Sequence, residues 1–287
     1  MTTVRQQLIE MRRRLDGIFD HREREAVILL IFSYVKKWSR VDLIINEDKE
    51  LSDFVKKEMD GIVDRLILGE PIQYITGEAR FHGMDLHVAP GVLIPRPETE
   101  ELVDWILDDS KDKEDLHVLD IGTGSGCIAI ALARNLPFSE VTAIDFSDVA
   151  LEQARKNASD LKAKVSFIHA DMYGWMPDNE SLDIIVSNPP YIAPDEKVDM
   201  EVRVKDYEPE SALFVTADDP IKPYRRIEEI ASDALKENGR VYLELNPRFA
   251  DDVSALFKGK GWQDVEVRID SYGKKRMLRA VKECQGL

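Results

Sequence analysis

Hydrophobic residues in the first part of the chain recur at the spacing of one face of an α-helix. The first stripe contains Val4, Leu8, Met11, Leu15 and Ile18, and the second contains Leu51, Phe54, Val55, Ile62, Val63 and Leu66. Between the stripes, residues 25–38 are apolar nearly all round, which is typical of a helix buried among others. This pattern predicts a small helical bundle, which we assign to residues 1–68.

The helical pattern stops at Gly69, and residues 69–77 carry Gly and Pro at spacings that predict a short extended linker. Residues 79–88 alternate loosely between apolar and polar, as in a β-hairpin. We assign this linker and hairpin to residues 69–95. A helix is then expected from about Pro97 through Leu107, because proline suits a first helical turn and acidic side chains there suit the helix dipole.

From Leu116 onward, short β-branched runs alternate with helical patterns. The predicted strands are 118–119, 141–144, 165–168, 184–186, 240–245, 264–269 and 277–281, and the predicted helices are 127–135, 149–157, 224–236 and 248–258. Strands that alternate with helices predict a parallel, doubly wound α/β sheet. We assign this sheet domain to residues 96–287.

Composition is that of an ordinary globular protein, with 44% hydrophobic and 33% charged residues among 287. The two cysteines, Cys127 and Cys284, lack a paired spacing, which argues against a disulfide framework or a zinc knuckle. The longest apolar run, residues 26–35, is too short to cross a bilayer, and the N-terminus lacks the layout of a signal peptide. We therefore expect a cytoplasmic protein that binds no membrane and no metal.

The net charge of −16 is unevenly distributed. Residues 1–75 contain 13 basic and 14 acidic side chains, so residues 76–287 carry a net charge of −15. Such a surface repels phosphate backbones and attracts basic protein partners. We expect no binding of free nucleic acid, and we expect a monomer.

The chain leaves the sheet at an unusual sequence, where the apolar run 184–186 is followed by Asn188, Pro189, Pro190 and Tyr191. Prolines cannot continue a sheet ladder, so the strand ends at the edge where α/β sheets place their ligands. The Asn188 side-chain carbonyl, the Pro189 backbone carbonyl and the Tyr191 ring would suit a planar group that bears an NH2. Such a nitrogen is a weak nucleophile, and orientation alone can supply about 7–11 kcal/mol. Taken alone, these four residues are equally compatible with a simple turn.

A glycine-rich turn, Gly122-Thr123-Gly124-Ser125-Gly126, follows the strand that ends at Asp120. Glycines let the backbone pass close to a ligand at a helix N-terminus. Dinucleotide enzymes use a similar turn, but the Gly-x-Gly-x-Gly register is unfavourable for a pyrophosphate.

Two further acids end the next two predicted strands. Asp145 could accept both hydroxyls of a ribose, or it could cap the following helix together with Ser147. Asp171 could accept from an adenine amino group while Met172 packs on the ring, or Asp171 could be a capping or solvated residue. Three strand ends that each present an acid, with a glycine turn at the first, predict a nucleoside pocket.

The combination of Asp120-x-Gly-x-Gly-x-Gly126, Asp145 and Asn188-Pro-Pro-Tyr191 resembles Rossmann-like class I S-adenosylmethionine-dependent methyltransferases that act on exocyclic or amide nitrogens. Longer matches at 69–77, 93–100, 188–192 and 207–213 resemble the HemK/PrmC family across essentially the whole chain. That family methylates the glutamine side chain of the Gly-Gly-Gln motif in class I peptide release factors.

This resemblance implies S-adenosylmethionine as cofactor, class I release factors as partners and an N-terminal bundle that recognises them. The implied cofactor-binding residues are Asp120, Gly122, Thr123, Gly124, Ser125, Gly126, Asp145, Asp171, Met172 and Asn188. Asn188, Pro189 and Tyr191 are the implied catalytic residues. The candidate substrate-binding set is Asn188, Pro189, Pro190, Tyr191, Arg96 and Glu98, although helix capping and surface pairing also explain the last two.

The chain departs from the family pattern at three places: Asn246 stands where a Gly is common, residues 216–221 lack the usual Gly, and Met172 replaces a frequent aromatic. Other substrates for the same pocket are a ribosomal-protein glutamine and an adenine amine, and the latter requires base flipping and a basic path. A non-catalytic S-adenosylmethionine-binding adaptor is the alternative outside enzymes.

Overall fold

The computed structural model describes residues 2–283, so Cys284 lies outside the described residues. Contacts between backbone positions divide the chain into two compact units. The first contains Met1–Gly77 and Glu201–Tyr207, and the second contains Glu78–Met200 and Glu208–Leu287. Each unit is described separately below. Within the described residues, no helix has both the length and the apolar character needed to cross a membrane.

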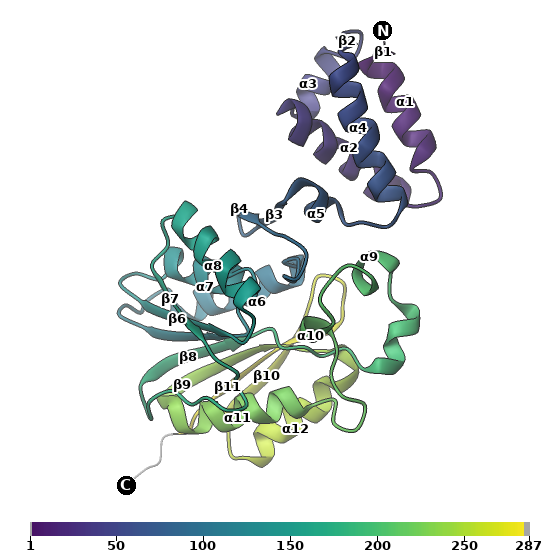
Figure 1. Ribbon diagram of the computed structural model, residues 1–287. Coiled ribbons are helices and arrows are strands. Elements are labelled where there is room, and N and C mark those ends of the chain that lie inside the picture. Colours follow the sequence, from purple (N-terminus) through teal and green to yellow (C-terminus); the bar gives the residue numbers. More distant parts are fainter. Residues whose placement is uncertain (1, 284–287) are drawn as a thin grey trace. The chain divides into compact units, whose positions relative to one another are not determined.

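The first unit is helical, as the apolar stripes predicted (Figure 1). Its elements are β1 (Thr2–Thr3), α1 (Val4–Arg14), α2 (His21–Lys36), α3 (Arg40–Ile45), β2 (Glu50–Leu51), α4 (Asp53–Ile67), α5 (Ile72–Thr76) and the distant α9 (Val202–Lys205). Its helices pack around a core in which Met11, Ile31, Phe32 and Met59 are fully buried.

Polar caps explain where these helices begin. The side chains of Thr3, Asp20, Ser39 and Ser52 each accept a hydrogen bond from the backbone N–H three residues later. Each cap satisfies one of the otherwise unpaired donors of a first helical turn. The bundle therefore has well-defined helix starts encoded in its own sequence.

The prediction of an extended linker at residues 69–77 was wrong in its conformation. Ile72–Thr76 forms the short helix α5, with Pro71 before its first turn and Gly77 in the left-handed conformation (φ 73°) after its last. Ile72 and Ile75 are buried in the core of the first unit. Proline has no donor to lose at a helix start, so Gly and Pro here bound a helix instead of preventing one.

A segment from much later in the chain completes the first unit. Arg203, in α9, pairs with Glu23 at 2.6 Å, and its guanidinium lies 4.5 Å from the centre of the Phe19 ring. The hydroxyl of Tyr207 donates to the carbonyl of Leu68 across 3.0 Å. Residues 201–207 are thus held to the bundle by an ion pair, a ring contact and a hydrogen bond.

The second unit is built on a seven-stranded sheet with the order β10-β11-β9-β8-β5-β6-β7. The strands are β5 (His117–Ile121), β6 (Glu140–Asp145), β7 (Val165–His169), β8 (Leu182–Ser187), β9 (Leu235–Glu244), β10 (Gln263–Ile269) and β11 (Lys275–Val281). A separate hairpin, β3 (Glu78–Phe81) with β4 (Met84–His87), confirms the prediction for residues 79–88.

The sheet is parallel except at β11, which runs antiparallel to both β9 and β10. The prediction of a parallel, doubly wound sheet is confirmed for the other strands, but it did not anticipate the antiparallel direction of β11. A short turn around Gly273 joins β10 directly to β11, and strands joined without a crossover helix must be antiparallel.

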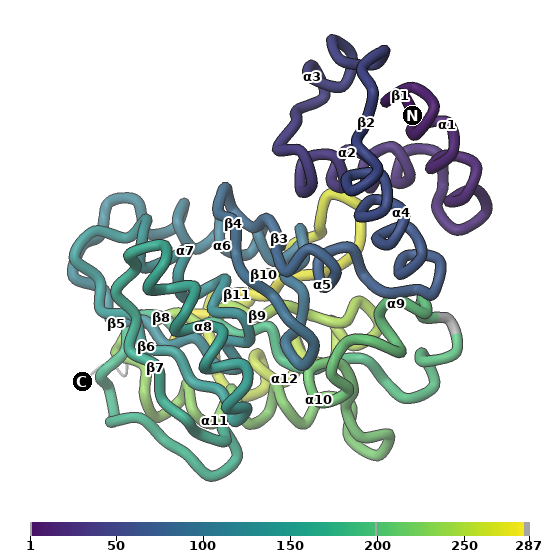
Figure 2. The backbone as a smooth tube through the Cα atoms, turned by 45° about the horizontal axis from the view of Figure 1, so that its top comes forward, coloured from purple at the N-terminus to yellow at the C-terminus, as the bar shows by residue number. Residues whose placement is uncertain are grey.

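Helices cover both faces of the sheet, and the two views place α7 and α8 on the face opposite α11 (Figure 1, Figure 2). The first face carries α6 (Pro97–Ser110), α7 (Cys127–Asn135) and α8 (Asp148–Asp160), and the second carries α11 (Lys222–Ala234) and α12 (Ala250–Gly259). Short helical segments η1 (Pro194–Asp199), α10 (Glu210–Leu213) and η2 (Pro247–Phe249) lie in the connections. The central strands β5 and β8 are mostly buried between these layers, as the apolar run 184–186 predicted for β8, whereas the outer strands β7 and β10 are partly exposed.

Candidate active site at the carboxyl edge of the sheet

Strand order reverses at β5, which pairs with β6 on one side and with β8 on the other. Open α/β sheets bind ligands in the crevice at such a switch point, outside the carboxyl ends of the strands. The hydroxyl of Ser187, at the end of β8, donates to the carbonyl of Ile121, at the end of β5, across 2.7 Å. The fold therefore brings the glycine turn, Asp145 and Asn188 to one edge, as predicted from the sequence.

The glycine turn after β5 requires glycine for two reasons. Gly122, Gly124 and Gly126 have φ values of 74°, 56° and 82°, in the left-handed region that side chains disfavour. At Gly126, a Cβ would also lie 3.0 Å from Ile130 Cδ1 and 3.1 Å from Ala154 Cβ. The turn thus lets α7 begin close against α8.

Asp145 holds this turn in place. Its Oδ2 accepts from the backbone N–H of Gly124 and its Oδ1 from that of Ser147, both at 2.9 Å. Burial raises the pKa of its carboxyl, which is 7% exposed. Each oxygen of a carboxylate has a second acceptor position. The loop-capping role and a ligand-binding role are therefore chemically compatible.

Asp120 is fully buried and lines neither of the two cavities described below. Its Oδ2 accepts from the Thr123 hydroxyl across 2.7 Å. Desolvation raises the pKa of Asp120 to about 7. Its direct contact is therefore with the glycine turn.

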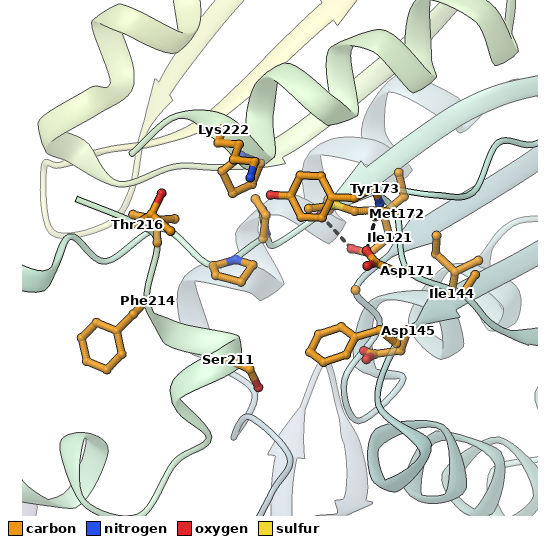
Figure 3. A pocket seen from close by; sticks show the side chains of 18 of the residues that line it. Ile121, Ile144, Asp145, Asp171, Met172, Tyr173, Ser211, Phe214, Thr216 and Lys222 are labelled. Atoms are coloured by element: carbon orange, nitrogen blue, oxygen red, sulfur yellow. Dashed lines mark hydrogen bonds between the residues drawn. The ribbon is translucent and has the colours of Figure 1, made fainter. Parts of the chain in front are cut away.

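Two cavities adjoin at this edge, and they share Gly122, Asp145, Phe146, Pro190 and Ser211 in their linings. The larger, of about 350 Å³, also contains Asp171, Met172 and Pro189 in its lining. Asp145, Asp171 and Met172 lie on one side of it, opposite Ser211, Phe214 and Thr216 (Figure 3). The smaller, of about 100 Å³, is lined by Thr123, Gly124, Ser125, Asn188, Arg96 and Thr99, among others.

Asp171 and Met172 are partly engaged by neighbouring groups. Asp171 is exposed, and its Oδ1 accepts from the backbone N–H of Tyr173 across 2.9 Å (Figure 3). The carbonyl of Met172 accepts from Arg226 Nε across 2.7 Å. Asp171 therefore caps its own turn while it faces the larger cavity.

The Asn188–Tyr191 segment is fixed by the chain that follows it. The backbone N–H groups of Tyr191 and Ile192 both donate to the carbonyl of Leu213, at 3.2 and 2.9 Å. Asn188 lines the smaller cavity, Pro189 the larger, and Pro190 both. Tyr191 lines neither cavity, so its position differs from the ligand-facing aromatic plate expected from the sequence.

Sequence reasoning missed the two residues that hold this segment from behind. The buried carboxylate of Glu244, at the end of β9, accepts from Tyr191 Oη at 3.0 Å and from Thr99 Oγ1 at 2.6 Å. Thr99 Oγ1 in turn accepts from Asn188 Nδ2 at 3.2 Å. Burial raises the pKa values of Glu244 and Tyr191. One signal was available, because Glu244 ends a predicted strand as Asp120 and Asp145 do.

The other two candidate substrate residues differ in their surroundings. The Arg96 guanidinium is paired with the buried carboxylate of Glu208, which also accepts from the Ile94 backbone N–H at 3.2 Å. Arg96 nevertheless lines the smaller cavity. Glu98, in the first turn of α6, lines neither cavity. Among the described residues, no group of three or more His, Cys, Asp or Glu side chains is arranged to hold a metal ion.

Comparison with known proteins agrees with the fold. Residues 6–77 match the PrmC N-terminal domain, and residues 100–205 match the methyltransferase small domain. A methyltransferase from Pyrococcus furiosus has the same fold, with a TM-score of 0.50 and 18% identity over 77% of this chain and 98% of that chain. The predicted class, a Rossmann-like class I methyltransferase sheet with an N-terminal helical bundle, is confirmed.

Relatives identify the family. The chain is 44% identical to the release factor glutamine methyltransferase of Bacteroides thetaiotaomicron over 271 residues, which is 94% of this chain and 97% of that protein. It is 40% identical to that of Flavobacterium psychrophilum over 92% of this chain and 94% of that protein. Because these identities extend over nearly the whole length of both chains, the protein is an enzyme that belongs to the release factor glutamine methyltransferase family.

Proposed function

We propose that this enzyme transfers a methyl group from S-adenosylmethionine to the side-chain amide nitrogen of the glutamine in the Gly-Gly-Gln motif of class I peptide release factors. The observation that carries the proposal is the placement of Asn188 and Pro189 at the cavities beside the glycine turn. The activity named for its relatives supports the same substrate.

The larger cavity fits the nucleoside part of this cofactor, since small-molecule sites are commonly of 300 Å³ or more. Its volume is about 350 Å³, and the carboxylates of Asp145 and Asp171 both line it. Asp145 would accept the ribose hydroxyls, and Asp171 with Met172 would hold the adenine. The backbone at Gly122 and Gly124 would pass beside the remaining tail. When bound, the cofactor supplies an electrophilic methyl carbon on a sulfonium sulfur.

Asn188 and Pro189 would orient the substrate nitrogen. The Asn188 side-chain oxygen and the Pro189 backbone oxygen would each accept one hydrogen bond from the glutamine NH2. These two hydrogen bonds would direct the nitrogen lone pair away from the two oxygens. The cofactor would supply the methyl group and leave as S-adenosylhomocysteine, while Asn188 and Pro189 would hold the nitrogen that forms the new bond and loses one proton to solvent. No strong base is needed, because orientation can supply about 7–11 kcal/mol of the barrier.

The helical bundle would grip the release factor outside the reacting glutamine. It exposes Val41, Ile44 and Ile45 on α3 and Phe54 on the first turn of α4, between 62% and 77%. Contiguous patches of exposed apolar side chains mark protein-interaction surfaces. The acidic sheet domain would favour a basic protein partner over nucleic acid.

The enzyme and labelled S-adenosylmethionine should be incubated in separate reactions with release factor, with ribosomal proteins and with DNA. Mass spectrometry should place the label on the glutamine of the Gly-Gly-Gln motif. The Asn188→Ala variant should lose at least about tenfold in kcat while cofactor affinity changes little. Label on another protein or on DNA would replace the proposed substrate, and normal turnover by Asn188→Ala would remove Asn188 from the mechanism.

A further inference from the structure

A chain of hydrogen bonds runs from the end of β9 to Asn188 through a residue on α6. Glu244 Oε2 lies 2.6 Å from Thr99 Oγ1, and Thr99 Oγ1 lies 3.2 Å from Asn188 Nδ2. Glu244 is 1% exposed and Thr99 is 2% exposed, so solvent does not compete for these contacts. A 2.6 Å contact between a hydroxyl and a carboxylate has the length of a charge-assisted hydrogen bond.

The donor and acceptor chemistry of these three groups gives the chain one direction. An ionised carboxylate only accepts hydrogen bonds, so the single hydroxyl proton of Thr99 points to Glu244. The lone pairs of Thr99 Oγ1 can then only accept, and the group of Asn188 that can donate is Nδ2. Because oxygen and nitrogen lie on opposite sides of a carboxamide, the Asn188 oxygen is held on the side away from Thr99.

We propose that Glu244 is a positioning residue that acts through Thr99 to fix the carboxamide of Asn188, so that its oxygen rather than its nitrogen is presented to the substrate amide. This inference rests on the proposed function, in which Asn188 Oδ1 accepts a hydrogen bond from the glutamine NH2. A flipped Asn188 would offer an NH2 to an NH2, and neither group can accept through its nitrogen. Loss of the chain therefore lowers the fraction of enzyme that can orient the substrate.

The polarity of the chain depends on the charge of Glu244. Its neighbours are the hydroxyls of Thr99 and Tyr191, the guanidinium of Arg276, which pairs with Asp270, and the carboxylate of Glu98; the Tyr224 hydroxyl donates to its backbone carbonyl. The charge of Glu244 also contributes to the raised pKa of the Cys127 thiol. Burial raises the pKa of Glu244, whereas the two hydroxyls and Arg276 oppose this rise.

A protonated Glu244 can donate to Thr99, which reverses the chain and lets Thr99 donate to the oxygen of Asn188. Activity that depends on the ionised form is present above the pKa of Glu244 and is lost as the pH falls through it. With cofactor and release factor both saturating, kcat should therefore decrease on the acid side of the profile.

The test uses the full-length enzyme and compares Thr99→Val with Thr99→Ser. Valine removes the hydroxyl at nearly constant volume, and we expect a fall in kcat of about tenfold. Serine retains the hydroxyl, so Thr99→Ser should keep most of the wild-type kcat. Cofactor affinity, measured by calorimetry, should not change in either variant. A Thr99→Val enzyme with normal kcat overturns the inference even if Asn188→Ala is defective, and in that case the proposed function stands.

A double-mutant cycle separates a relay from a general effect on folding. If Thr99 acts through Asn188, Thr99→Val should lower kcat in the wild-type background but not in Asn188→Ala. Equal losses in both backgrounds overturn the inference. Normal turnover by Asn188→Ala alone overturns the inference together with the role of Asn188 in the proposed function.

Glu244→Gln keeps the shape of the side chain and removes its titration. The acid limb of the kcat profile should disappear in this variant and in Thr99→Val. Glu228→Gln is the matched control, because the buried carboxylate of Glu228 also accepts from two side chains, but these are Ser232 Oγ at 2.9 Å and Trp262 Nε1 at 3.0 Å instead of Thr99 and Tyr191. Glu228→Gln should keep both kcat and the limb. An acid limb that persists in Glu244→Gln overturns the inference.

Discussion

The side-chain amide of Asn246 donates a hydrogen bond to the backbone carbonyl of Tyr191 across 2.9 Å. The same nitrogen donates to Glu196 at 2.8 Å, and the Asn246 oxygen accepts from the backbone N–H of Arg248 at 2.9 Å. Asn246 is 4% exposed. Where the family pattern led us to expect glycine, this chain therefore has a side chain that joins the end of β9 to the Asn188–Tyr191 segment.

Replacement of Asn246 by Ala should destabilise the second unit and loosen the segment that carries Tyr191. Two part-buried acceptors and one donor would lose their partner, which should lower the free energy of unfolding by about 1–3 kcal/mol. The midpoint temperature of thermal unfolding and kcat should both decrease. Asn135→Ala is the control, since Asn135 is the exposed last residue of α7 and its side chain donates to the Ala131 carbonyl one turn earlier. Equal effects of the two substitutions would contradict the prediction.

Glycine-to-alanine substitutions at two positions should change the free energy of unfolding in opposite directions. Gly126→Ala combines a left-handed φ of 82° with a Cβ only 3.0 Å from Ile130 and 3.1 Å from Ala154, so we expect a loss of about 1–3 kcal/mol. Gly61→Ala lies within α4, where an added Cβ meets nothing within 4 Å, and should gain about 0.5–1 kcal/mol. Urea unfolding measures both, and a stable Gly126→Ala enzyme would show that α7 and α8 can separate.

The buried carboxyl of Asp120 should make stability fall as the pH rises. Its pKa is raised from 3.8 to about 7, so between these values the folded protein binds more protons than the unfolded chain. By linkage, the free energy of unfolding decreases with pH across this window, by on the order of 4 kcal/mol. Asp120→Asn cannot titrate and should lack this slope. Denaturant unfolding of both proteins from pH 4 to 8 tests the sign, and parallel curves would refute it.

The Arg96–Glu208 pair should be more important for stability than either charge alone indicates. Arg96→Ala would leave the nearly buried Glu208 carboxylate without its counter-charge, at a cost of about 3 kcal/mol. Adding Glu208→Gln removes that charge and should recover part of the loss, because the glutamine oxygen can still accept from Ile94. Thermal unfolding of the single and double variants measures the recovery. A raised KM for the release factor without loss of stability would instead assign Arg96 to substrate binding.

Local pattern was sufficient for most of the second unit. The apolar run 184–186 and the prolines after it placed the end of β8, and the glycine turn placed the start of α7. These predictions succeeded because strand burial, proline geometry and positive φ are properties of a few adjacent residues. Pattern failed at residues 69–77, where glycine and proline bound a helix, and at β11, where a tight turn reverses the strand direction.

What the sequence determined by itself was the order of elements and the chemistry available at the edge of the sheet, from the glycine turn to Asn188. What only the tertiary structure decided was which groups hold that chemistry in place. Thr99 and Glu244 are separated by 145 positions in the chain and meet at 2.6 Å. Residues 201–207 likewise join the bundle formed by residues 1–77. No spacing encodes such contacts, because they arise when the sheet brings strand ends and crossing helices together.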